Sequence, residues 1–382
     1  MNESASNRNV LFVVMDTVRK DHLSCYGYER ETTPGLETFC EEAAVFEQAV
    51  APAPWTLPVH ASLFTGLYPG EHGATQENPY LEGAVTLAES LTDHTSSCYS
   101  SNAWITPYTH LTDGFSDQDN FFEVMPGDLL SGPLARGWKL MNDSERLRTV
   151  ADWLVNIGNE VHEHLASSSG ADSKTPAVID RTIEFIEDSD EPYFSFINLM
   201  DAHLPYHPPE EHREQFAPGV DSTTVCQNSK EYNCGARDIS KSEWESIRGL
   251  YDAEIHHIDA QLDRLFEWMR ANDEWEDTLV IVCADHGELH GEHDLYGHEF
   301  AVYDPIVNVP LMVKHPDLDA GEYEKQVELT DLYHTVLDHT ETNGRGVSLD
   351  PERSLLSDSY REFDGGENAF IEYYRPVVEL NQ

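Results

Sequence analysis

Basic residues are scarce in this sequence: 23 lysines and arginines stand against 71 aspartates and glutamates, which leaves a formal net charge of -48. Such a chain lacks the positive surface that binds phosphates, so nucleic acid is excluded as a partner. The acidic residues run from Glu3 to Glu379 and form no separate tail, which indicates a solvated acidic surface. Molar salt shortens the range of electrostatic repulsion to about 3 Å, so a strongly acidic chain is tolerated at high salt. This composition is therefore typical of a halophile that accumulates salt.

Long hydrophobic runs are also absent. Residues 1–9 are polar, and the apolar run that follows ends at Met15, which is too short for a signal peptide or a membrane span. The six cysteines show no spacing typical of a metal site or a disulfide framework. We therefore expect no membrane span, reduced thiols and a cytoplasmic location.

The chain nevertheless has the material for a core, since 40% of its residues are hydrophobic and 10% are aromatic. At 382 residues, one large domain with a small appendage is expected. The stretch 208–240 is rich in proline, glycine and charge, and we interpret it as a surface insertion placed to cover the functional site.

Three predicted buried strands each lead into side chains that bind metals or transfer protons. Asp16 follows the strand 9–15, Asp201 and His203 follow the strand 193–200, and Asp285 and His286 follow the strand 278–283. Helical periodicity predicts helices over 34–43, 57–65, 144–165, 176–187, 243–270 and 328–337. Alternating strands and helices indicate an α/β fold whose functional residues gather at one edge of the sheet.

The segment 54–66 is predicted to be a loop that leads into a helix. Pro58 suits the first turn, and Thr56 suits the capping position. Free amides at that helix start would attract an anion. The alternative is that Thr56 only caps the helix.

The segment 285–298 is unusually dense in metal-type residues. An adjacent Asp-His pair, Asp285 and His286, can face one cation with both side chains. Three glycines in the segment bend the chain around this pair. The alternative is that these histidines are solvated loop residues.

Together these blocks resemble the sulfatase family of the alkaline-phosphatase superfamily. The resemblance is carried in order by 9–16, Cys25-Tyr26-Gly27, 63–69, 201–206, Asp285-His286-Gly287, 291–293, 297–298, 309–313 and 331–332. It covers the chain to about residue 340. It implies a large mixed, mostly parallel sheet flanked by helices on both faces, with a sulfatase-like catalytic domain at 1–343. Residues 344–382 would then be a short remnant of the family's small second domain, with 368–374 as its first strand.

By the same resemblance, one divalent ion (Mn, Zn, Mg or Ca) is held by Asp16, Thr56, Asp285 and His286. Thr17 stands where sulfatases place a second metal aspartate, and His286 replaces the frequent asparagine with the histidine of phosphatase relatives.

Thr56 falls where sulfatases carry the cysteine or serine that becomes formylglycine. Threonine cannot be oxidised to that aldehyde, so no formylglycine is expected. Thr56, activated by the metal, would instead attack phosphorus and form a phosphothreonine that water hydrolyses. Residue chemistry thus favours phosphate monoesters or diesters, whereas family likeness favours sulfate esters.

Four further residues match substrate-binding positions of the family. His60 replaces its arginine and Asn102 its lysine, and the lost charges suit a diester; both residues would donate hydrogen bonds to the transferred group. His203 and His298 match positions that serve the transferred group and the leaving oxygen, with burial in the core as the alternative. Asp201 is expected either to orient His203 or to bind a second metal.

Two other functions stay open. One alternative is a catalytically degenerate protein that binds an anionic glycan. The other is a phosphotransferase, which is less favoured because no membrane span is predicted. The expected substrate is a small anionic ester or a sulfated or phosphorylated glycan. The oligomeric state is not encoded in any pattern found.

Overall fold

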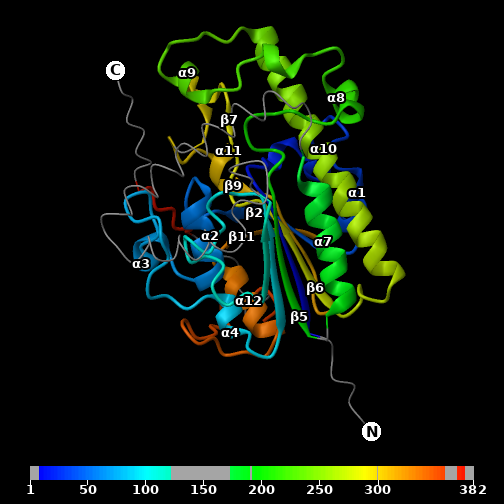
Figure 1. Ribbon diagram of the computed structural model, residues 1–382, viewed down its shortest axis with the longest axis vertical. Helices are drawn as coiled ribbons and strands as arrows, with labels where there is room; N and C mark the ends of the chain where they lie inside the picture. Colours follow the sequence, from blue (N-terminus) through cyan, green and yellow to red (C-terminus); the bar gives the residue numbers. More distant parts are fainter. Residues whose placement is uncertain (1–7, 122–172, 190–191, 299, 358–367, 375–382) are drawn as a thin grey trace, which may run out of the picture.

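A nine-stranded sheet forms the centre of the computed structural model, which describes residues 8–121, 173–189, 192–298, 300–357 and 368–374 (Figure 1). Its strand order is β11-β2-β10-β6-β1-β5-β3-β4, and β9 pairs with β2. The strands are β1 (Asn9–Met15), β2 (Ala44–Val50), β3 (Thr95–Ser100), β4 (Asp117–Asn120), β5 (Tyr193–Leu199), β6 (Thr278–Cys283), β9 (Asn308–Val309), β10 (Leu311–Lys314) and β11 (Gly321–Glu328). A separate hairpin joins β7 (Leu289–His290) to β8 (Tyr296–Gly297).

The sheet is mixed and mostly parallel, as predicted. β1 lies parallel to both β5 and β6, and β3 lies parallel to β5 and β4. Only β10 and β9 run against their neighbours in this sheet of the described chain. Because the central strands are parallel, Asp16, Asp201 and Asp285 follow strands that end at the same edge.

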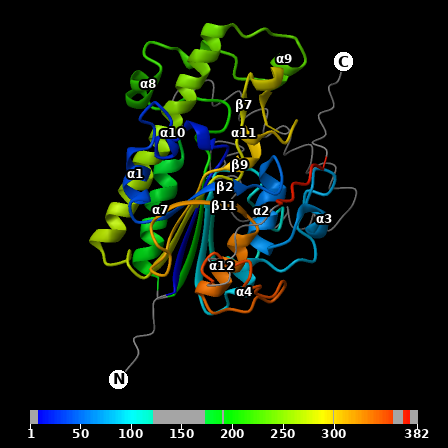
Figure 2. The same ribbon diagram turned by 180° about the vertical axis from the view of Figure 1, so that it is seen from behind.

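Helices cover both faces of the sheet, and Figure 2 shows the same two layers from behind. One layer contains α1 (Pro34–Cys40), α7 (Thr175–Asp188), α8 (Glu210–Phe216) and α10 (Lys241–Ala271). The other contains α2 (Thr56–Thr65), α3 (Pro69–His72), α4 (Leu87–Ser90) and α12 (Asp331–His339). Shorter pieces are α9 (Ser229–Asn233), α11 (Asp304–Val307), η1 (Lys20–His22), η2 (Ser24–Tyr26), η3 (Ser222–Thr224) and η4 (Glu292–Asp294).

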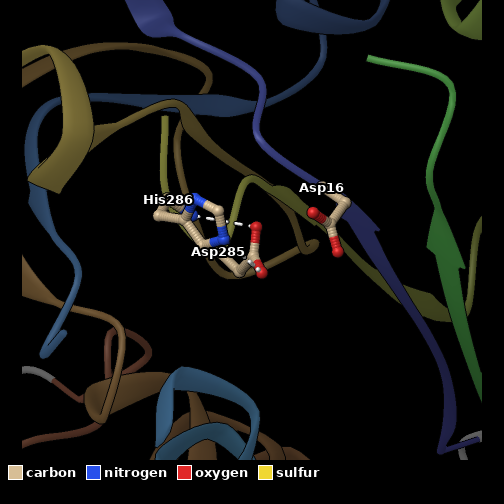
Figure 3. Close-up of side chains that lie close together, drawn as sticks. All are labelled: Asp16, Asp285 and His286. Atoms are coloured by element: carbon tan, nitrogen blue, oxygen red, sulfur yellow. Dashed lines mark hydrogen bonds and ion pairs between the residues drawn. The ribbon is translucent and has the colours of Figure 1, made fainter. Parts of the chain in front are cut away.

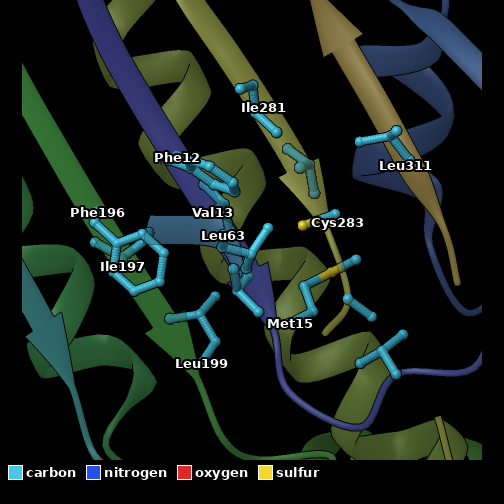
Figure 4. Packing of buried hydrophobic residues seen from close by; sticks show 14 of the residues in the cluster. Phe12, Val13, Met15, Leu63, Phe196, Ile197, Leu199, Ile281, Cys283 and Leu311 are labelled. Carbon is cyan, nitrogen blue, oxygen red and sulfur yellow. The ribbon is translucent and has the colours of Figure 1, made fainter. Parts of the chain in front are cut away.

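The core lies between the central strands and these helices (Figure 4). Phe12 of β1 and Phe196 of β5 meet edge to face with ring centroids 5.6 Å apart, and Leu63 of α2 is fully buried beside them. Each such side chain stabilises the fold by about 1.5–3 kcal/mol. The ends of β1, β5 and β6 are therefore fixed by packing on both faces.

The predicted helices that fall on described residues form within about three residues of their expected limits, whereas one expected strand does not form. Glu328 belongs to strand β11, so α12 starts only at Asp331. Residues 368–374 form no strand; Glu372 makes one backbone bond, from its N–H to the carbonyl of Pro52 (2.8 Å). The predicted helix 144–165 lies outside the described residues.

The segment 208–240 packs against its neighbours more closely than a surface loop would. It contains α8, which lies along α10, and α9, whose Asn233 donates a hydrogen bond to the carbonyl of Tyr296 in β8 (2.8 Å). Phe216 and Cys226 are buried. No helix in the described ranges is both long and apolar enough to cross a membrane.

Candidate metal centre and active site

Two carboxylates and one imidazole meet at the carboxyl edge of the sheet. Asp16 follows β1, and Asp285 and His286 follow β6 (Figure 3). One ligand atom from each of the three lies within 4.8 Å of the others, and all three side chains are fully buried. The sequence prediction placed the same three residues around one cation.

Two asparagines hold Asp16 in place. Asn102 donates from Nδ2 to Asp16 Oδ2 at 2.8 Å, and Asn198 donates to the same oxygen at 3.2 Å. The other oxygen, Oδ1, has no hydrogen bond within the described chain. One face of the carboxylate is therefore oriented, and the other is left for a ligand.

Asp285 and His286 are oriented in the same way. Asp285 Oδ1 accepts hydrogen bonds from the amides of Thr17 (3.2 Å) and His286 (2.9 Å), whereas Oδ2 receives none from the described residues. His286 Nδ1 lies 3.0 Å from the carbonyl of Gly287, which assigns the ring proton to Nδ1. The lone pair of Nε2 then faces Asp285 Oδ2 at 3.4 Å.

The electrostatics of this group fit a divalent cation. Burial, followed by the charge of Asp285, raises the pKa of Asp16 to about 6. Burial also raises the pKa of Asp285 to about 7 and lowers that of His286 to about 4. Two oriented carboxylates with one free oxygen each, beside a neutral imidazole, form a donor set that Zn²⁺ or Mn²⁺ accepts.

Backbone strain lies next to this group. Thr17 has φ +58°, which a β-branched residue rarely adopts and which costs about 1–3 kcal/mol. Its carbonyl accepts a hydrogen bond from the Tyr251 hydroxyl at 2.8 Å, and its own hydroxyl donates to the Asp16 carbonyl at 2.7 Å. The Thr17 side chain therefore turns away from the centre, and its amide turns toward Asp285.

Gly287 allows the chain to pass closely after His286. A Cβ at this position would lie 2.0 Å from the carbonyl oxygen of Pro305, closer than any side chain tolerates. The amide of Gly287 donates to the carbonyl of Ile306 at 2.7 Å. Glycine is thus required for the loop geometry that points His286 inward.

Thr56 is the first residue of α2 and not its cap. The N-cap is Trp55, whose side chain makes no capping bond, so the capping role expected for Thr56 is wrong by one residue. The Thr56 hydroxyl lies 3.4 Å from His286 Nε2 and is buried. It therefore faces the metal group, and the helix start directs the first free amides toward the same place.

His60 and Asn102 lie at the centre with most of their polar atoms engaged. His60 is fully buried; its Nδ1 lies 3.0 Å from the carbonyl of Thr56 and 3.6 Å from Asp285 Oδ2. Burial lowers its pKa to about 3, so the ring is neutral. The amide of Asn102 contacts Asp16, and its Oδ1 accepts from the amide of Trp104 at 2.8 Å. Both residues support the ligands and the helix start.

Two further histidines extend the site. The ring of His298 lies 4.4 Å from that of His286 and 5.2 Å from that of His203, measured between centroids. Burial lowers the pKa of His298 well below its usual value. The three rings of His286, His298 and His203 thus lie next to one another, and the roles of His298 and His203 remain those that the family resemblance implies.

Asp201 lies on the other side of this edge. Its carboxylate accepts a hydrogen bond from the Thr175 hydroxyl of α7, and its charge acts on Glu254 and His257 of α10. His203 Nδ1 lies 2.6 Å from the carbonyl of Leu204. Asp201 therefore belongs to the contacts between α7 and α10.

Sequence reasoning missed Glu288 and Asn198. Glu288 is fully buried 3.8 Å from His298 Nδ1, and neither of its oxygens has a hydrogen bond of normal length within the described chain. Burial raises its pKa to about 8. The signals for these residues were an acidic side chain inside the dense 285–298 segment and a polar side chain inside the apolar strand before Asp201.

Comparisons with known proteins agree with this architecture. The family model described as Sulfatase matches residues 8–342. The arylsulfatase of Clostridium perfringens is 21% identical over 403 residues, which cover 95% of this chain and 82% of that protein.

Two solved structures share the fold. The phosphonate monoester hydrolase of Agrobacterium radiobacter superposes with a TM-score of 0.71 at 21% identity, covering 97% of this chain and 81% of that one. The C-terminal periplasmic domain of the phosphoethanolamine transferase EptC from Campylobacter jejuni does so with a TM-score of 0.63 at 13% identity, covering 92% and 94%.

Proposed function

This chain belongs to the sulfatase family, and on that premise we propose that it is a metal-dependent hydrolase of phosphoric esters with Thr56 as its nucleophile. At the level of the family, such enzymes act on sulfate or phosphate esters, by hydrolysis or by transfer. We assign residues 1–343 to the catalytic domain and 344–382 to a short C-terminal segment, which the family match over 8–342 supports.

The observation that carries the proposal is the position of the Thr56 hydroxyl. It lies 3.4 Å from His286 Nε2, at the start of a helix, and faces two carboxylates that each keep one oxygen free. A residue that only capped α2 would bond the helix amides, whereas the hydroxyl of Thr56 lies against His286 Nε2. Threonine here also excludes formylglycine, so sulfate transfer by the aldehyde hydrate does not apply.

Asp16, Asp285 and His286, together with Thr56 Oγ1, would hold one divalent cation, with Zn²⁺ or Mn²⁺ preferred for mixed oxygen and imidazole ligands. When bound, this ion lowers the pKa of a hydroxyl at the site and offsets the negative charge of the transferred group. Asn102 and Asn198 fix the Asp16 carboxylate, and the carbonyl of Gly287 fixes the His286 tautomer.

Chemistry on the chain itself then takes two in-line steps. Thr56 Oγ1 gives its proton to solvent water and attacks phosphorus; the P–O bond to the leaving group breaks, the departing oxygen takes up a proton, and the Thr56 phosphoester forms. Water attacks the same phosphorus from the opposite side, which releases phosphate, or a monoester from a diester, and restores the hydroxyl. The free amides at the start of α2 stabilise the oxygens of the transferred group.

His203 and His298 serve the leaving oxygen. Their rings lie 5.2 Å apart next to His286, where a leaving group opposite Thr56 would emerge. A bound anion supplies the negative charge that favours a protonated imidazole, which then donates its proton to the departing alkoxide. His60, whose Nδ1 faces the Thr56 carbonyl, holds the nucleophile's backbone in place.

The test compares p-nitrophenyl phosphate, bis-p-nitrophenyl phosphate and p-nitrophenyl sulfate in molar KCl, which suits the acidic composition, with Zn²⁺, Mn²⁺, Mg²⁺ or Ca²⁺ added. We expect phosphoester turnover that chelation removes and that is lost in Thr56→Ala, with a mass increase of one phosphoryl group on the Thr56 peptide after acid quench. Sulfate turnover that survives Thr56→Ala would overturn the mechanism. Phosphoryl transfer to added glycerol at the expense of hydrolysis would identify a phosphotransferase instead.

A further inference from the structure

A second group of imidazoles lies away from the active centre, between α8 and α10, which run side by side in Figure 1. His212 of α8 stands between two consecutive histidines of α10. Its Nδ1 lies 2.6 Å from His256 Nδ1, and its Nε2 lies 3.2 Å from His257 Nδ1. The ring centroids of both pairs are 4.9 Å apart. Three imidazoles thus meet through their nitrogens.

Two of the three rings are largely shielded from water. His212 and His257 are buried, with exposed fractions of 6% and 5%, and His256 is half-buried. Burial lowers the pKa of His212 to about 4 and lowers the pKa of both other rings. Neutral imidazole is the form that binds transition metals.

Carboxylates act on each of the three rings. Glu211 acts on all three imidazoles, Glu31 acts on His256, and Asp201 acts on His257. The cluster therefore combines imidazole nitrogens with nearby carboxylate oxygens, a donor set that borderline divalent ions accept.

We propose that His212, His256, His257 and Glu211 form a second metal site, separate from the catalytic centre, that takes Zn²⁺ or a similar borderline divalent ion. Ligand atoms around tetrahedral zinc are about 3.3 Å apart, given bonds of about 2.0–2.1 Å. His212 Nε2 lies 3.2 Å from His257 Nδ1 and 3.4 Å from Glu211 Oε1, but these atoms are not yet all within 4.8 Å of one another, as those of the strand-end group are.

Two side-chain rotations complete the site. The side chain of Glu211 is 82% exposed and therefore free to turn toward the ion. The Nδ1 of His256 now lies against His212 Nδ1. The His256 ring must turn so that one of its nitrogens lies on the side of His212 Nε2, where the ion would bind. His257 is already fixed from behind, because its Nε2 lies 3.0 Å from the Ser173 hydroxyl, and such an outer contact sets the ring orientation of a metal ligand.

An ion at this position would have a structural role. Four protein ligands leave no open coordination position for a substrate. The ion would tie α8, and with it the start of the 208–240 segment, to the long helix α10. Binding to the folded state alone would raise the melting temperature as the ion concentration rises above its Kd.

The experiment counts metal ions on untagged, chelator-treated protein after equilibrium dialysis against Zn²⁺, and records the visible spectrum with Co²⁺. Five proteins are compared: wild type, the double variant His212→Gln/His257→Gln, the catalytic-centre variant Asp16→Asn/Asp285→Asn, the quadruple variant that combines both sets of substitutions, and the control His110→Gln, a surface histidine paired with Asp113. We expect two ions in wild type and control, and one in each double variant. The Co²⁺ bands of tetrahedral coordination should persist in the catalytic-centre variant and disappear from it when His212 and His257 are also replaced.

The inference fails if wild type binds one ion, or if the histidine variant still binds two. Loss of fold in that variant is checked by circular dichroism, and the single substitution Glu211→Gln, at an exposed position, provides the alternative: it should weaken the second ion about 10–100-fold without unfolding the protein. If the Asp16→Asn/Asp285→Asn protein keeps both ions, the catalytic metal assignment is wrong while the second site stands.

Discussion

The strand-end centre of Asp16, Asp285 and His286 and the helix cluster of His212, His256 and His257 both gather metal-type side chains, yet they are built differently: the first is fully buried, whereas His256 of the second is half-buried. At the strand ends, the ligand atoms already lie within 4.8 Å of one another. In the helix cluster the nitrogens meet in pairs, and two side chains must turn to share one ion. The Thr56 hydroxyl, the proposed nucleophile, lies 3.4 Å from His286 Nε2 at the strand-end centre.

The difference comes from the scaffold. Parallel strands of one sheet end together and fix their final residues through packing on both faces, and backbone amides then orient Asp285. Helices α8 and α10 touch along one side only, so rotamers stay freer near the solvent. We infer that the rigid group serves chemistry, which depends on sub-ångström positioning, and the adaptable group serves structure.

The largest expected effect is on phosphoester turnover, which should depend on the strand-end centre and not on the helix cluster. Thr56→Ala should reduce phosphoester kcat by at least about 10⁴-fold, because it removes the nucleophile. His212→Gln should stay within about twofold of wild type, as should the control Thr38→Ala on the surface of α1. Initial rates at saturating substrate measure this. Comparable losses in Thr56→Ala and His212→Gln would mean that the helix cluster belongs to the active site.

The pH dependence of metal affinity should differ next. Asp16 and Asp285 have folded pKa values raised to about 6 and about 7, so metal binding must displace their protons. Affinity should therefore fall about tenfold per pH unit for each proton displaced between pH 7 and 5. The imidazoles of the helix cluster have lowered pKa values and stay neutral over much of this range. Calorimetric titration at pH 5.5 and 7.5 measures the metal affinity of each double variant. An equal change of affinity with pH at the two sites would contradict this prediction.

The same pKa shifts affect stability. Raised pKa values mean that the metal-free fold gains stability from protonated Asp16 and Asp285 below pH 4, and loses that stability as pH rises through about 6 to 7. A bound cation removes this loss. The rise in melting temperature on adding metal should accordingly be larger at pH 8 than at pH 5 in the His212→Gln/His257→Gln protein, which keeps only the strand-end centre.

Asn102→Ala should have a smaller effect, confined to the strand-end centre. Without the 2.8 Å bond from Nδ2, Asp16 loses its closest orienting partner, and metal affinity there should fall about 10–100-fold. The helix-cluster ion should be unaffected. Asn272→Ala, at an exposed position at the end of α10, is the matched control. Unchanged affinity in Asn102→Ala would assign Asn102 to substrate binding alone, as its place in the sequence first indicated.

Salt should produce the smallest difference. Glu211 is 82% exposed, so its attraction for an ion is screened, whereas Asp16 and Asp285 are fully buried and screened far less. Raising KCl from 0.1 to 2 M should weaken the helix-cluster ion several-fold and the strand-end ion by less than about twofold. Equilibrium dialysis of the two double variants at both salt concentrations measures how far the affinity of each ion falls. An equal response would indicate that Glu211 is not a ligand.

Much of the strand-end centre could be predicted from the sequence because its signals are local. A buried β-strand followed at once by Asp16, and another followed by Asp285 and His286, specify both the element and the residue at its edge. The α/β class and most helix limits follow from the same periodicity. The capping role of Thr56 failed by one residue, since a helix start depends on whether the side chain finds amides to bond or, as here, a neighbouring imidazole.

The sequence by itself determined the strand ends and the residue types at the centre, because these depend on neighbours along the chain, and its composition determined the net negative charge. Tertiary structure alone decided that Asn102 holds Asp16, that Glu288 lies buried beside His298, and that His212 meets His256 and His257. Most of these contacts join residues far apart in sequence. They exist only because strand order and helix packing place those residues together, and local patterns carry no information on that order.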